Sequence, residues 1–179
     1  MKPEVNWKQV QVVAFDLFGT VFKLDRPKEE IQAYAEHIAK PEWSPLELPK
    51  EWGRLEMFED AKQGLLNIQA SEDVTCITLS NAPFNLQDEL ECYDWCNAIV
   101  ALEDYQVFKP NINAYVAACI DMRELPRNIL MVTANEYFGD LEKSRQIGMQ
   151  SILIDRKNKY PDMPHTILEL AQIMGEGRK

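Results

Sequence analysis

The chain has 179 residues, with 29 acidic against 19 basic side chains and a formal net charge of −10. This length suits one domain with a small insertion, and an apolar content of 46% is sufficient for a buried core. The acidic balance, without a lysine- or arginine-rich run, argues against nucleic acid, and no apolar run approaches the roughly 18 residues of a membrane span. We therefore expect a cytoplasmic protein that binds neither nucleic acid nor membrane.

The first predicted element is a strand at Val10–Ala14, a β-branched apolar run typical of a strand buried on both faces. It leads into Phe15 and Asp16 and then into a turn that contains Gly19. An acid at the carboxyl end of such a strand lies where open α/β sheets bind ligands. Asp16 is therefore a candidate functional residue, although a turn-capping role is the simpler alternative.

The next stretch, from Phe22 to about Gln69, predicts two helices separated by irregular chain. The first helix runs from about Asp25 to Lys40, and the second from Leu55 to Ala70. Three prolines and two tryptophans lie in this stretch outside the first helix: Pro41, Trp43, Pro45, Pro49 and Trp52. Core filling or a docking face explains the tryptophans more simply than a place over an active site.

The remaining chain alternates strands with helices. Strands are predicted at Val74–Leu79, Ala98–Ala101, Ile129–Val132 and Ser151–Ile154. Helices are predicted at 86–93, 111–122, 140–147 and 165–174. This alternation indicates an α/β fold, a Rossmann-like parallel sheet with right-handed crossovers and helices on both faces.

The four cysteines form no C-x-x-C pair: Cys76, Cys92, Cys96 and Cys119. Cys92 and Cys96 can share a helix face, but the only histidines, His37 and His165, show no matching ligand spacing. We interpret the cysteines as reduced, packed thiols rather than as a metal site.

Polar residues stand at corresponding places in four of the strand–helix units: Asp16, Ser80, Lys109 and the pair Thr133/Asn135. In a parallel sheet these places share one edge, so we expect the side chains to converge. Four such residues in separate units are difficult to explain by chance.

These segments resemble the four motifs of the haloacid dehalogenase superfamily. The resemblance covers Phe15–Val21, Leu79–Asn81, Lys109-Pro110 and Val132–Asn135, the last followed by Asp140 and Gly148. It implies a core at residues 1–21 and 70–179 and a reduced helical cap at 22–69. It also implies a hydrolase in which Asp16 is the nucleophile.

Two positions distinguish the branches of this superfamily. Its phosphatases carry a second Asp two residues after the nucleophile, where this chain has Phe18, and a metal-binding Asp where it has Asn135. The 2-haloacid dehalogenases resemble this chain at both places, and they have a Tyr where Tyr115 stands, six residues after Lys109. Asp140 lies farther from Asn135 than the corresponding dehalogenase Asp lies from its Asn.

The chemistry of the leaving group explains why this chain differs from the phosphatases at Phe18. A halide leaves as a stable anion and needs no proton, whereas an alkoxide leaving group benefits from a donor that Phe18 cannot be. In this interpretation Asp16 forms an ester with a small anionic substrate and water hydrolyses it. Thr20, Ser80 and Asn135 orient groups, Lys109 keeps Asp16 ionised, and four residues bind substrate: Phe18, Asn81, Tyr115 and Thr133. This dehalogenase needs no cofactor, and Arg26 and Arg54 are weak candidates for a carboxylate-binding arginine.

Four alternatives remain open. The chain can be a phosphatase whose Mg²⁺ is bound by Asp16 and Asp140, or a catalytically inert binding protein on the same scaffold. Tyr115 can be a core residue, and Asp140 can be an ordinary acid in the first turn of a helix.

Overall fold

A computed structural model describes residues 4–179 and contains a five-stranded parallel sheet. Its strands are β1 (Val12–Phe15), β2 (Thr75–Leu79), β3 (Ala98–Val100), β4 (Ile129–Thr133) and β5 (Gln150–Leu153). The order across the sheet is β3-β2-β1-β4-β5, so β1 lies at the centre with β2 and β4 on either side. The predicted Rossmann-like α/β fold is thereby confirmed.

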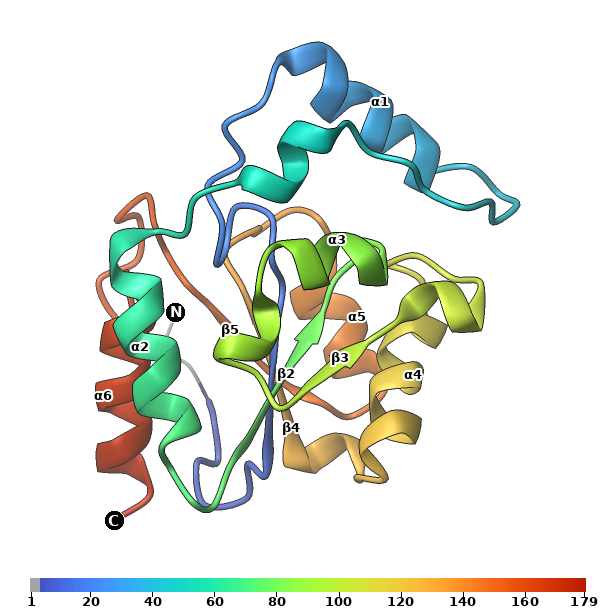
Figure 1. Cartoon of the computed structure of the whole chain (residues 1–179). Coiled ribbons are helices and arrows are strands. Elements are labelled where there is room, and N and C mark those ends of the chain that lie inside the picture. The colour runs from blue at the N-terminus through green and yellow to red at the C-terminus, as the bar shows by residue number, and fades with distance from the viewer. Residues whose placement is uncertain (1–3) are drawn as a thin grey trace.

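Helices cover both faces of this sheet (Figure 1). Helices α2 (Glu59–Gln69) and α6 (Ile167–Gly177) pack side by side, whereas α4 (Ile112–Met122) packs beside α5 (Asp140–Gln146). Alternate residues of β1 point to opposite faces, so Val13 and Phe15 join one apolar cluster with α2 and α6, and Val12 and Ala14 join another with α4. The central strand β1 is therefore an uninterrupted apolar run, because both of its faces are buried.

The insertion after β1 leaves and rejoins the core through a short paired stem. Phe22 forms an antiparallel bridge with Met57, and the Lys23 amide donates to the Glu56 carbonyl oxygen at 2.8 Å. Beyond the stem lie α1 (Lys28–Ile38), which has no fully buried residue, and the 3₁₀ turn η1 (Lys50–Arg54). Figure 1 shows both above the sheet.

The stem explains why α2 begins at Glu59 instead of the predicted Leu55: residues 56–58 are extended because they pair with residues 21–23. Helix α2 then buries Leu65 and Ile68 against the core. Gly64 lies against α6 so closely that an added Cβ would stand 2.7 Å from the Ile167 carbonyl carbon. We therefore propose that the cap ends at the stem, near residue 57, and that α2 belongs with the sheet.

Smaller differences concern the chain after β2. The helix predicted at 86–93 is divided into α3 (Phe84–Glu89) and the 3₁₀ turn η2 (Cys92–Asp94). Glu91 between them adopts a left-handed backbone conformation with φ of 56°, which ends the first helix. The turn η3 (Leu102–Tyr105) follows β3, and η4 (Pro126–Asn128) precedes β4.

The cysteines are unpaired thiols, and three of them are buried. Burial raises the pKa of both Cys76 and Cys96 to about 12, so these thiols stay protonated at neutral pH. Residues 4–179 contain no group of three or more His, Cys, Asp or Glu side chains placed to hold a metal ion. Over the same range, no helix combines the length and the apolar character needed to cross a bilayer.

Candidate active site

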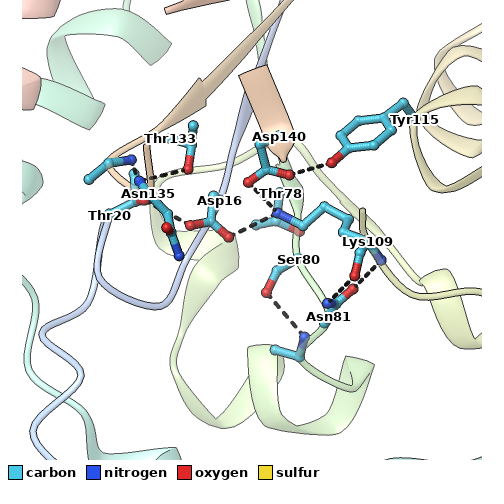
Figure 2. Close-up of polar contacts among 12 residues, drawn as sticks. Asp16, Thr20, Thr78, Ser80, Asn81, Lys109, Tyr115, Thr133, Asn135 and Asp140 are labelled. Carbon is cyan, nitrogen blue, oxygen red and sulfur yellow. Dashed lines mark hydrogen bonds and ion pairs between the residues drawn. The ribbon is translucent and has the colours of Figure 1, made fainter. Parts of the chain in front are cut away.

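The polar residues predicted to converge do so at the carboxyl edge of the sheet (Figure 2). Asp16 directly follows β1, Ser80 directly follows β2, and Thr133 ends β4. Lys109 comes from the loop before α4, and Asp140 is the first residue of α5. Separate units of the parallel sheet therefore deliver these side chains to one place.

Lys109 is the centre of the charged network, although only 1% of the residue is exposed. Its ammonium donates to Asp16 Oδ1 at 2.9 Å and to Asp140 Oδ2 at 3.0 Å. Burial opposes the charge on Lys109, but Asp140 and Asp16 outweigh it and raise the pKa of Lys109 above its usual value. One buried cation thus neutralises one of two carboxylates.

Burial also governs Asp16. Desolvation raises the pKa of Asp16, and the nearby Asp140 carboxylate raises it further, whereas Lys109 and the Thr20 hydroxyl act in the opposite direction. The Thr20 hydroxyl donates to Asp16 Oδ2 at 2.8 Å and accepts a hydrogen bond from the Ala134 amide at 2.9 Å. Both oxygens of Asp16 therefore have donors that favour its anionic, nucleophilic form.

Tyr115 is fully buried, and its hydroxyl donates to Asp140 Oδ1 at 2.6 Å. Burial and the Asp140 carboxylate raise the pKa of Tyr115, so its hydroxyl keeps its proton. Tyr115 therefore contacts Asp140 rather than Asp16. Asp140 in turn has one oxygen on Tyr115 and the other on Lys109.

The other predicted residues fix the local backbone. Asn81 accepts from the Lys109 amide at 2.7 Å and donates to the Lys109 carbonyl oxygen at 3.0 Å, so it clamps the chain that carries the ammonium. The Ser80 hydroxyl accepts from the Ala82 amide, and the Thr133 hydroxyl accepts from the Asn135 amide. Asn135 itself is exposed.

Phe18 lies under an aromatic cluster supplied by the insertion. Its ring meets Tyr34 of α1 and Trp52 of η1 edge to face, with ring centroids 5.6 and 5.0 Å apart. The Trp52 indole donates to Glu30 at 2.8 Å, and Glu30 also binds Arg26 through two hydrogen bonds of 2.9 Å. The surroundings of Phe18, two residues after Asp16, are thus apolar. Arg26, a weak candidate for binding a substrate carboxylate, is already paired with Glu30 within the insertion.

No family model and no curated protein matches the sequence. Solved structures do match the fold. An L-2-haloacid dehalogenase from Xanthobacter autotrophicus with chloropropionic acid covalently bound has a TM-score of 0.74 at 15% identity, covering 93% of this chain and 98% of that one. A defluorinating L-2-haloacid dehalogenase has a TM-score of 0.77 at 18% identity, covering 98% and 99%.

The chain has the haloacid dehalogenase fold. A phosphatase with this fold, from Thermococcus onnurineus, matches with a TM-score of 0.69 at 16% identity and covers 95% of this chain and 100% of that one. The haloacid dehalogenase fold therefore accommodates both chemistries considered for the site, and the side chains must distinguish them.

A cavity of about 380 Å³ opens beside the carboxyl edge of the sheet in this haloacid dehalogenase fold. Its lining includes Phe18, Gly19 and Asn135 from the motif loops, Phe58 from the end of the stem, and Arg156 from the loop after β5. Arg54 is exposed on η1, away from this lining.

Sequence reasoning missed Tyr34 and Arg156. The only signal at Tyr34 was its place in the apolar spacing of the first predicted helix, and such a spacing does not show which part of the molecule the helix covers. The position of Arg156 is recognisable, because this residue comes shortly after the end of a predicted strand, as Asp16 and Ser80 also do. That position was the available signal, but no motif of the superfamily points to it.

Proposed function

We propose that the chain is a hydrolase of the haloacid dehalogenase superfamily, of dehalogenase type, with Asp16 as its nucleophile. The observation that carries the proposal is the pairing of Asp16 Oδ1 with Lys109 and of Oδ2 with Thr20, beside an apolar Phe18. Lys109 and Thr20 favour the ionised form of Asp16 against the burial that raises its pKa, and Phe18 offers no acid to a leaving group.

In the proposed reaction a carboxylate oxygen of Asp16 attacks the carbon that bears a halogen. The new carbon–oxygen bond forms as the carbon–halogen bond breaks, and the halide departs with the bonding electrons. Water then attacks the carbonyl carbon of the Asp16 ester, and the bond from that carbon to the product oxygen breaks. The product oxygen keeps one proton of the water as a hydroxyl group, the other proton is released, and the Asp16 carboxylate is restored. Lys109 stabilises the negative charge that develops on the Asp16 oxygen in this second step.

The charge of the site supports a substrate with little negative charge. Asp16, Asp140 and Lys109 together carry a net charge of −1 when all three are ionised. A phosphate dianion would meet this charge without a compensating cation, whereas a haloacid is a monoanion. We therefore propose a small, singly charged halogenated acid as the substrate class.

Hydrolase assays on halogenated acids and on phosphate esters, each with and without Mg²⁺, test the function directly. We expect halide release from a short 2-haloacid that is independent of Mg²⁺. Magnesium-dependent release of phosphate would favour the phosphatase, for which the similarity to the Thermococcus onnurineus structure is the supporting observation. Failure to turn over either class would favour the inert binding protein.

Magnesium binding should be weak. Mg²⁺ requires near-octahedral oxygen ligands, but Lys109 already contacts Asp16 and Asp140, Tyr115 contacts the other Asp140 oxygen, and Asn135 is neutral and exposed. These residues do not fit the ion. Calorimetric titration should give a dissociation constant in the millimolar range or above, since competition with a buried ammonium weakens any site. Micromolar affinity would contradict the proposal.

Phe18→Asp should lower haloacid turnover by about 10-fold or more. The new carboxylate would stand near Asp16 and raise its pKa further, and a protonated Asp16 is a poor nucleophile. Phosphatase activity should stay low unless Asn135→Asp also rebuilds a metal site. Steady-state rates on both substrate classes for the single and double variants measure this, with Phe18→Leu as the uncharged control. A gain of about 10²-fold in phosphatase rate from Phe18→Asp alone would mean that the metal site already functions.

A further inference from the structure

Arg156 connects the catalytic loop to the packed helices behind it. Its Nη2 donates to the Thr20 carbonyl oxygen at 2.6 Å, and its Nη1 pairs with Asp60 at 3.0 Å. The guanidinium also lies over the ring of Phe58, 3.6 Å from the centroid. Two segments far apart in the sequence, the loop after β1 and the start of α2, therefore hold one side chain.

Asp60 makes this a firm attachment. It lies in the first turn of α2, and its carboxylate accepts a second hydrogen bond from the Ile167 amide at the start of α6, at 2.8 Å. The Arg156 and Asp60 side chains are only 15% and 18% exposed, so water competes little for their contacts. The α2–α6 pair, tightly packed at Gly64, thus anchors the guanidinium.

Thr20 is the residue at the other end of this connection. Its carbonyl oxygen receives Arg156, and its hydroxyl donates to Asp16 Oδ2. The amides of Thr20, Val21 and Phe22 all donate to the Leu17 carbonyl oxygen, at 2.9 to 3.1 Å, so this loop is one tight turn. Fixing the Thr20 carbonyl therefore fixes the direction of its hydroxyl.

We propose that Arg156 is a positioning residue, which holds Thr20 so that its hydroxyl stays on the nucleophile. The inference rests on the proposed role of Asp16. A direct role as the carboxylate-binding arginine is the competing explanation, since Arg156 lines the cavity beside the site. The contacts of its guanidinium argue against this role: Nη1 donates to Asp60, Nη2 donates to both Thr20 and Asp60, and Nε is buried.

Kinetics on a 2-haloacid separate these roles. Arg156→Gln should lower kcat by about 10²-fold, the effect of a misplacement of about 1 Å, and leave KM within about threefold. Arg156→Lys, which keeps the charge and one donor, should recover part of the loss. In a Thr20→Val background, which lacks the hydroxyl, Arg156→Gln should cost less than about threefold, because the residues act through one hydrogen bond. A rise in KM with unchanged kcat, or losses that multiply, would overturn the inference.

Amide hydrogen exchange tests the same inference without turnover. In Arg156→Gln, exchange at Thr20, Val21 and Phe22 should accelerate about 10-fold, because the turn loses its external support. Arg145→Gln is the matched control: Arg145 also donates to a backbone carbonyl, that of Ser151 in β5, but does not contact the catalytic loop. Unchanged exchange at Thr20–Phe22 in Arg156→Gln would refute the positioning role. If exchange accelerates but the wild-type protein hydrolyses nothing, the proposed function fails and the structural connection stands.

Discussion

Asp16→Asn should lower hydrolysis of any substrate by about 10⁴-fold or more, the scale seen when an enzyme loses its nucleophile. Asn lacks the negative charge that attacks the substrate carbon. No other carboxylate replaces it, because Asp140 is fully buried and has both oxygens engaged by Lys109 and Tyr115. Steady-state halide or phosphate release measures the loss.

The fold should survive this substitution. Lys109 keeps its partner Asp140, and the charged cluster changes from a net charge of −1 to zero, so no buried charge is left unpaired. Far-UV circular dichroism and the thermal midpoint should therefore stay close to those of the wild type. Turnover within about 10-fold of wild type would remove Asp16 as the nucleophile.

Lys109→Met should destabilise the protein by about 3–5 kcal/mol, the usual cost of breaking a buried ion pair on one side. Met preserves much of the aliphatic stem, so the main loss is the ammonium between two carboxylates that are 2.9 and 3.0 Å away. Urea denaturation at neutral pH measures the free energy of unfolding. A loss below about 1 kcal/mol would mean that the carboxylates are well solvated without Lys109.

The destabilisation should depend on pH. With the ammonium gone, Lys109 no longer opposes the burial that raises the pKa of Asp16, so the folded variant binds a proton there more tightly than the unfolded chain does. The loss should therefore be greatest at neutral pH and shrink as the pH falls towards about 4, the ordinary range of a carboxyl group. Lys109→Met/Asp140→Asn is the matched control, because it leaves a single carboxylate and should recover part of the stability at neutral pH.

The sheet and the polar residues at its carboxyl edge were predictable because their signals are local. β1 is a short apolar run that ends directly before Asp16, and β2, which is mostly apolar, ends directly before Ser80. Parallel pairing then requires those positions to meet at one edge. The order of strands and helices thus placed Asp16, Ser80 and Lys109 in the same region, whereas Asp140 stayed an open alternative until the structure showed its contact with Lys109.

The support of the site was not predictable in the same way. Arg156 reaches Thr20 and Asp60 across separations of 136 and 96 residues, and spacing along the chain contains no information about such contacts. The start of α2 was misplaced for a related reason. Leu55 and Phe58 fit a helical period, but residues 56–58 pair with the segment after β1, and long-range pairing overrides a local pattern.

The stem at Phe22 and Met57 makes the insertion a replaceable module. Because the chain departs and returns at bridged neighbours, residues between them can be lengthened, shortened or exchanged without changing the distance that the core must span. The sheet, Lys109 and Asp140 lie outside that segment, whereas Tyr34 and Trp52 lie within it. Changes within the insertion can therefore alter what packs over Phe18, while the contacts of Asp16 with Lys109 and Thr20 stay constant.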